Sequence, residues 1–224
     1  MEVAPTIILM SNNIIDNLVR ELRSEIERGL IHQSWITNQH GPQTTQFAPL
    51  DLSKTILKTR IRPLFKEISD DGDVERDAEA ALHVDTAVCR ILAILVYIHC
   101  DKSTLDGFRS RFISNSSLIT RDSDLPLQKP VARSLFGANL GDRFYTKQFI
   151  FCPIILKEDE EVECRDDQQW CRLPFENSVP LGSGSSGTVS KVTIPKGHFR
   201  SSDPTWGLNQ QVRTSNYHLI ILLK

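Results

Sequence analysis

The sequence predicts an α+β protein with a mainly helical N-terminal region followed by a strand-rich, antiparallel C-terminal part. Two observations predict the helices: leucine and isoleucine recur every four residues in 12–36, and the run 87–98 is apolar on nearly all sides. Residues 181–194, LGSGSSGTVSKVTI, indicate strands around a glycine-rich turn. The composition changes around residues 140–150, so we expect one domain over 1–140 and a second over 141–224.

The first helix is expected over residues 12–36, with Ser11 as its N-cap. Its apolar positions share a spacing of four residues and are Ile14, Leu18, Leu22, Ile26 and Leu30. The polar segment 37–49 contains a Gly-Pro turn signal and predicts a linker or long loop. A second helix is expected to begin near Asp51 or Ser53, with Pro63 close to its middle.

The strongest helical pattern covers residues 74–99, and we expect a central helix there. An acidic turn at 69–73 precedes it, and early acidic residues suit the positive end of a helix dipole. A short helix is expected over 103–112. The aromatic and β-branched run 144–156 predicts a strand, and the apolar run 218–224 predicts another.

Composition and charge exclude several classes of protein. The chain has 224 residues, of which 40% are hydrophobic and 24% charged, with a formal net charge of -2. This balance favours neither nucleic acid nor an anionic membrane as a partner. The N-terminus lacks the basic region of a signal peptide, and no apolar run approaches the ~20 residues of a membrane-spanning helix. We therefore expect an intracellular, cytoplasmic protein.

The cysteines and histidines indicate no metal site. The five cysteines are scattered without a C-x-x-C pair, and no histidine lies at zinc-ligand spacing from them. Cys89 and Cys100 fall in apolar surroundings, which predicts buried free thiols. The acidic turn lacks the full ligand frame of a calcium loop.

The glycine-rich segment has the pattern G-x-G-x-x-G-x-V, formed by Gly182, Gly184, Gly187 and Val189. Such a loop directs backbone N–H groups at nucleotide phosphates, and glycine avoids a collision with them. A Rossmann site needs a helix after the glycines, and a Walker A loop needs Lys where Thr188 stands. A plain glycine- and serine-rich linker remains the alternative.

In order along the chain, several segments resemble a group of filamentous-fungal serine/threonine protein kinase-like proteins. The resemblance covers roughly residues 50–224, and its most diagnostic part is the glycine loop. The matching segments are ILAILVYI (91–98), DLPL (124–127), ARSLFG (132–137), QFIFCPIIL (148–156), RLPF (172–175) and LGSGSSGTVSKVTIPKGHF (181–199).

This resemblance implies an incomplete kinase N-lobe that binds a nucleotide, ATP as Mg-ATP. The implied nucleotide-binding residues are Leu181, Gly182, Ser183, Gly184, Ser185, Ser186, Gly187, Val189 and the phosphate-pairing Lys224. In a full-length relative, the resemblance also implies transfer of the γ-phosphoryl group to serine or threonine. The connection between the second and third strands of the lobe would be 195–216.

Two positions depart from the family pattern: Ser186 replaces an aromatic residue, and Leu222 replaces a small one. No catalytic-loop or metal-binding motif of a kinase occurs in the sequence, so we assign no catalytic residue and expect the chain by itself to be catalytically incomplete. The alternative is a non-enzymatic module in which the helical region, through the helix at 12–36, binds a protein partner beside a vestigial kinase remnant.

Overall fold

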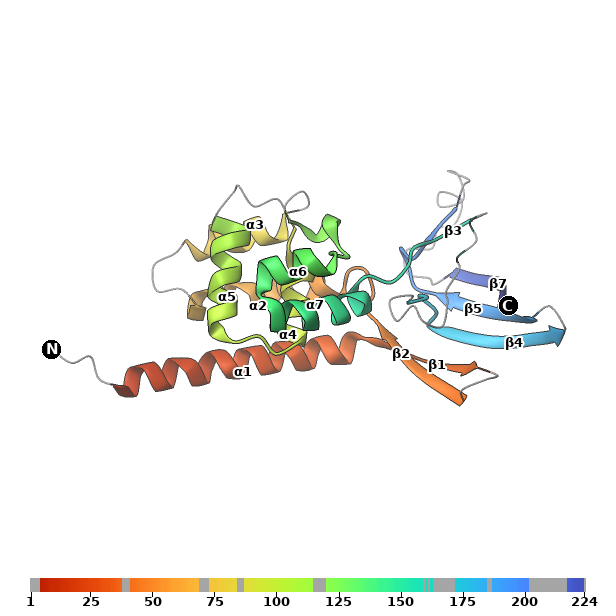
Figure 1. Ribbon diagram of the computed structural model, residues 1–224, viewed down its shortest axis with the longest axis horizontal. Coiled ribbons are helices and arrows are strands. Elements are labelled where there is room, and N and C mark those ends of the chain that lie inside the picture. Colours follow the sequence, from red (N-terminus) through yellow and green to blue (C-terminus); the bar gives the residue numbers. More distant parts are fainter. Residues whose placement is uncertain are drawn as a thin grey trace. The chain divides into compact units, whose positions relative to one another are not determined.

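The computed structural model of the chain describes residues 5–37, 41–68, 73–83, 87–114, 120–158, 160, 162, 172–184, 187–201 and 217–223. It is an α+β fold in which helices predominate, as the sequence predicts (Figure 1). By contacts the chain divides into two units. One unit contains Met1–Gly29 and Asp51–Gln148, and the other contains Leu30–Leu50 and Phe149–Lys224. The domain boundary predicted near residue 140 stays a prediction.

The first unit is built from helices. They are α1 (Pro5–Gly29), α2 (Leu52–Ile68), α3 (Val74–Leu82), α4 (Cys89–Tyr97), α5 (Lys102–Arg109), the short η1 (Ser110–Ser114) and η2 (Asp122–Asp124), α6 (Lys129–Phe136) and α7 (Ala138–Phe151), whose last residues belong to the second unit. Helix α4 lies against both α1 and α2 (Figure 1). All six residues from Ile91 to Val96 are fully buried, as expected for an apolar central helix.

Helix α1 is amphipathic, but its buried stripe differs from the predicted one. Ile15, Val19, Leu22 and Ile26 are buried, whereas Ile14 is 47% exposed. A helix has 3.6 residues per turn, so a strict spacing of four drifts off the buried face. The N-cap prediction at Ser11 is wrong because α1 already begins at Pro5, a residue suited to the first helical position.

The segment after α1 is a β-hairpin, so the predicted helix to residue 36 and the predicted linker over 37–49 are both wrong. Strand β1 (Ile31–Thr37) pairs antiparallel with β2 (Gly41–Phe47) in an unbroken register. The helix ends at Gly29, where an added Cβ would lie 2.2 Å from a side-chain carbon of Leu52. Cross-strand pairing overrides the polar composition of β2.

The predicted single helix over 74–99 is instead two helices. Helix α3 ends at Leu82, because the C-cap residue His83 has an extended backbone. Helix α4 then begins at Cys89 without a local side-chain cap, since Val88 has no group that can accept. Asp122, more than thirty residues away, supplies the cap: its carboxylate accepts from the N–H of Arg90 at 2.8 Å and of Ile91 at 3.0 Å.

The strand predicted over 144–156 is wrong up to Phe151, because this part forms the end of α7. Phe144 is buried and packs against Phe136 of α6, with the rings tilted and 4.6 Å between their centroids. Gln148, one turn further, is fully buried and bonds both backbone groups of Leu127, at 2.7 and 2.8 Å. These tertiary contacts favour a helix over the strand propensity of the aromatic residues.

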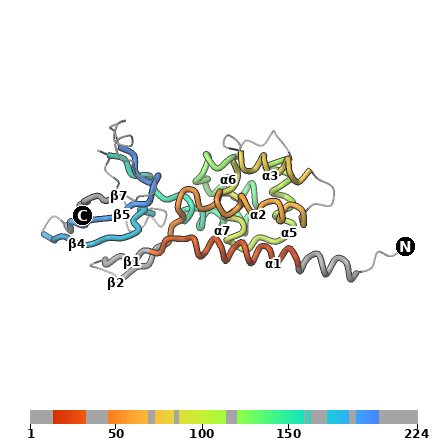
Figure 2. Tube along the Cα trace, turned by 180° about the vertical axis from the view of Figure 1, so that it is seen from behind, coloured from red at the N-terminus to blue at the C-terminus, as the bar shows by residue number. Residues whose placement is uncertain are grey.

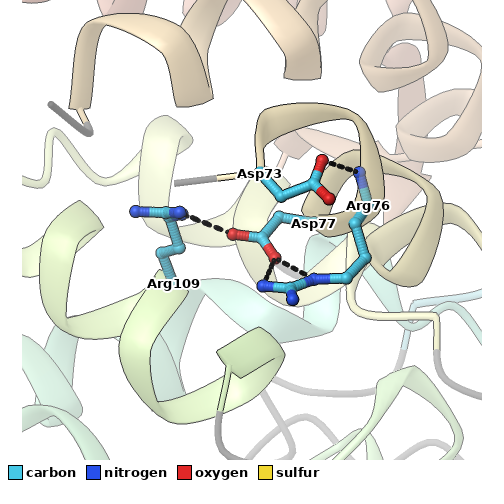
Figure 3. Close-up of polar contacts among 4 residues, drawn as sticks. All are labelled: Asp73, Arg76, Asp77 and Arg109. Atoms are coloured by element: carbon cyan, nitrogen blue, oxygen red, sulfur yellow. Dashed lines mark hydrogen bonds and ion pairs between the residues drawn. The ribbon is translucent and has the colours of Figure 1, made fainter. Parts of the chain in front are cut away.

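A buried ion pair joins α3 to α5. The Asp77 carboxylate is 1% exposed and accepts from the Arg109 guanidinium at 2.7 Å, and it also accepts from Arg76 at 3.2 Å (Figure 3). Asp73, the last residue of the acidic turn, caps α3 by accepting from the Arg76 N–H at 3.1 Å. A buried carboxylate without these partners would cost several kcal/mol.

The second unit carries the sheets. Besides the β1–β2 hairpin, β3 (Leu156–Lys157) pairs with β6 (Phe199–Arg200) in parallel, and β4 (Asn177–Gly184), β5 (Gly187–Ile194) and β7 (Tyr217–Leu223) form an antiparallel sheet in the order β4-β5-β7. Both views show these strands, Figure 2 from behind. The small core of this unit is formed by Phe175, Val192 and Ile194.

Removal of the Asp122 cap is expected to destabilise the helical unit. Asp122→Ala leaves two helix N–H groups without their acceptor, at a cost of about 1–2 kcal/mol in the free energy of unfolding. Burial raises the pKa of the Asp122 carboxyl, although the N–H groups of Arg90 and Ile91 act in the opposite direction. The charge is therefore costly to bury, and Asp122→Asn, which keeps an acceptor oxygen, should remain closer to wild type. Urea unfolding followed by circular dichroism measures both variants.

Asp16→Ala, at an exposed position of α1, is the control for loss of a negative charge. Equal losses for the Asn and Ala variants at residue 122 would contradict the capping role.

The same substitution at two glycines should have opposite effects. A Cβ at Gly141 would lie 2.6 Å from the Ala132 carbonyl oxygen and from the Arg133 Cα, so Gly141→Ala should cost about 1–3 kcal/mol. Gly107 in α5 has no atom within 4 Å of an added Cβ, and Gly107→Ala should stabilise by about 0.5–1 kcal/mol. Thermal and urea unfolding test the pair, and a neutral or stabilising Gly141→Ala would contradict the close approach of α6 and α7.

Candidate functional site

The glycine-rich segment forms the antiparallel hairpin β4–β5, as predicted. Gly182 pairs with Val189, and Gly184 with Gly187, at the end of the hairpin. The register shifts between Pro180 and Gly182, so Leu181 occupies a β-bulge. The hairpin thus brings together Leu181, Gly182, Ser183, Gly184, Gly187 and Val189, whereas Ser185, Ser186 and Lys224 lie outside the described residues.

The two faces of β5 differ. Ser190, Val192 and Ile194 are buried, and the latter two pack with Phe175, Leu173 and Phe199. The residues between them, Val189, Lys191 and Thr193, are half-buried or exposed. This alternation confirms the predicted half-buried return strand.

The fold itself does not require glycine at 182 or 184. Both glycines are exposed, neither has a positive φ, and a Cβ at either position would meet no atom within 4 Å. By contrast, Gly197 has a φ of +87° and turns the chain between β5 and β6. The backbone at 182–184 is therefore accessible to a ligand, and any steric need for these glycines would come from that ligand.

Strand β7 confirms the strand predicted over 218–224 as far as Leu223. It pairs with β5 so that Leu222 lies opposite Val189 and Leu223 opposite Thr188. The end of β7 is thus brought to the glycine-rich end of the hairpin, from more than thirty residues away in the sequence. The predicted phosphate-pairing residue, Lys224, follows directly in the sequence.

Two exposed apolar side chains lie on β4 near the glycines. Leu181 is 55% exposed and Val179 is 49% exposed, and Val179 pairs with Lys191 in the register. The sequence predicts Leu181 as a residue of the site but gives no signal for Val179. The β-bulge at Leu181 shifts the register, so the pairing of Val179 with Lys191 does not follow from the sequence alone.

Sequence reasoning also missed His198, a fully buried residue of the second unit. Its ring packs edge-on against Phe47 with 5.7 Å between centroids, and its carbonyl accepts from the N–H of Leu156 at 2.9 Å. His198 therefore joins β2, the loop after β5 and β3 within one unit. No local pattern signals this, because its partners are distant in the sequence.

Cys89, Cys100 and the possible metal ligands among the described residues form no reactive or metal-binding site. Cys89 and Cys100 are buried and free, as predicted, and burial raises the pKa of each thiol to about 12. Both stay protonated near neutral pH, which excludes them as thiolate nucleophiles. Among the residues that the structure describes, no group of three His, Cys, Asp or Glu side chains could hold a metal ion.

Nor does any described helix combine the length and apolar character needed to cross a membrane.

The chain matches no protein-family model, no curated protein and no solved structure. The kinase-like resemblance therefore stays a prediction that rests on the ordered motifs of the sequence.

Proposed function

We propose that the β4–β5 hairpin binds the phosphates of a nucleotide, ATP as Mg-ATP, as the first part of a kinase-like N-lobe. The observation that carries the proposal is the strand order β4-β5-β7, with the glycines at the exposed end of the hairpin and the end of β7 beside them. This is the strand order that the kinase-like resemblance implies for the glycine loop, the return strand and the lysine strand.

The surroundings of the glycines suit a phosphate chain. Because a Cβ added at Gly182 or Gly184 would have no atom within 4 Å, phosphate oxygens can approach the backbone closely. Leu181 and Val189 supply exposed and half-buried apolar surface next to the glycines, which a base could cover. Lys224 would pair with the phosphates, a role that rests on the resemblance alone.

The proposed activity is binding, with no catalytic residue assigned. Phosphoryl transfer needs a catalytic aspartate and metal-holding groups in addition to the glycine loop, and the sequence has no motif for them.

The protein partner predicted for the helical region also stays a prediction. From Ile15 onward, the apolar stripe of α1 is buried within the helical unit.

Replacement of the glycines is expected to separate binding from stability. Gly182→Ala and Gly184→Ala should leave the free energy of unfolding unchanged or raise it slightly, because the backbone conformation suits alanine and the added methyl meets open space. Both should weaken Mg-ATP binding at least about tenfold, since a methyl group would hold the phosphates away from the backbone N–H groups. Isothermal calorimetry measures the affinity and urea unfolding the stability.

Gly107→Ala in the helical unit is the matched control and should leave Mg-ATP affinity unchanged, whereas Lys224→Ala should weaken it. The proposal fails if wild type shows no saturable binding at millimolar Mg-ATP. It fails equally if the hairpin variants bind as tightly as the Gly107→Ala control.

A further inference from the structure

A cavity of about 440 Å³ opens on the helical unit, and no residue of the glycine hairpin lines it. It is lined by one face of α7, by the end of α4 and by α1. The α7 residues recur at helical spacing and are Asn139, Asp142, Arg143, Thr146 and Lys147. A cavity of this size accommodates a small metabolite.

Three of the lining residues carry a positive charge and one carries a negative charge. Arg23, Arg143 and Lys147 face the cavity, and in the part of the chain that the structure describes neither Arg143 nor Lys147 has a carboxylate ion-pair partner. Arg23 is paired with Glu27 at 2.8 Å. The acidic lining residue is Asp142. Its carboxylate accepts two hydrogen bonds from Arg133, at 2.6 and 2.7 Å, and the positive charge of Arg133 compensates its negative charge.

The guanidinium groups are held in place by the end of α4. Arg143 donates to the carbonyl of Ile98, the C-cap residue, and Arg23 donates from Nη1 to Nδ1 of His99 at 3.0 Å. A guanidinium has no acceptor, so Nδ1 must be unprotonated and Nε2 carries the ring proton as a donor. The Nε of Arg23 is buried and has no hydrogen-bond partner among the described residues.

His99 occupies a backbone position that favours glycine. Its φ is +56°, and the bonds from its N–H to Val96 and from the Cys100 N–H to Leu95, both 3.1 Å, form a Schellman motif with His99 at C′. A side chain there costs conformational energy that glycine would avoid. Helix termination therefore does not explain the imidazole, which instead lines the cavity between Arg23 and Arg143.

We propose that this cavity binds a small phosphate-bearing molecule, with Arg143 and Lys147 supplying the two positive charges that a phosphate dianion needs. Arg23 and the imidazole of His99 complete the donor set, and Asn139 and Thr146 provide polar contacts for the rest of the ligand. Guanidinium groups fit phosphate oxygens through paired N–H bonds, and their prior fixation by Ile98 and His99 lowers the entropic cost of binding.

The test titrates inorganic phosphate and, separately, glycerol 3-phosphate against the whole chain without magnesium or nucleotide, with ionic strength held constant by NaCl. The imidazole signals of His99 are followed by NMR. Saturable shifts are expected, and Lys147→Gln should weaken binding roughly tenfold because a charge-assisted hydrogen bond to phosphate is lost. Arg143→Gln should do the same, but it also removes the bond to Ile98, so Lys147→Gln carries the test.

Arg20→Gln, an equal loss of charge at an exposed position of α1, is the matched control and should leave the affinity unchanged. His99→Gly lacks the reporter imidazole and is titrated by calorimetry instead; it should bind phosphate more weakly while its melting temperature stays equal or rises. Tighter binding of glycerol 3-phosphate assigns the cavity to an organic phosphate, and equal binding assigns it to free phosphate.

The proposal is overturned if NaCl alone produces the same shifts, if no saturation occurs, or if Arg20→Gln and Lys147→Gln weaken binding equally. Gly184→Ala should leave phosphate affinity unchanged, which separates this site from the proposed nucleotide site on the β4–β5 hairpin.

Discussion

The capping of α4 by the Asp122 carboxylate is the contact on which the helical unit depends most. The buried helix begins without a local side chain that can accept from its first N–H groups, and burial leaves no water to replace one. Asp122 provides the acceptor and also donates its own N–H to the carbonyl of Ala87 at 2.9 Å. One residue thereby fixes both the start of α4 and the path of the chain before α6.

Two other buried polar contacts act in the same way. Gln148 of α7 satisfies both backbone groups of Leu127, and Asp77 of α3 is satisfied by Arg109 of α5. Each joins segments that are more than twenty residues apart, and each would be costly if one partner were missing. Asp122 and Gln148 hold α4 and α7 in place, and these are two of the three helices that line the cationic cavity.

The two proposed sites use the backbone differently. On the hairpin, Gly182 and Gly184 are exposed and a Cβ added at either would meet no atom within 4 Å, so the fold has no steric need for glycine there. At the end of α4, a histidine stands where the backbone favours glycine, and its imidazole accepts a hydrogen bond from Arg23. At both sites the fold alone does not account for the type of residue found there, and binding of a ligand would account for it.

Local pattern was enough to predict the helical majority, the apolar α4, the glycine hairpin and the strand before Lys224, because each depends on periodicity or turn residues within a short window. It gave the wrong state for β1, for β2 and for the end of α7. There, pairing of β1 with β2 and the burial of Phe144 and Gln148 outweigh weak propensities. The cavity between α1, α4 and α7 had no signal in the sequence, since Arg23, His99 and Lys147 are brought together only by helix packing. The sequence determines which charged and polar side chains the protein has. The distances between them depend on helix packing, and this packing depends on which buried polar atoms form hydrogen bonds when the chain folds.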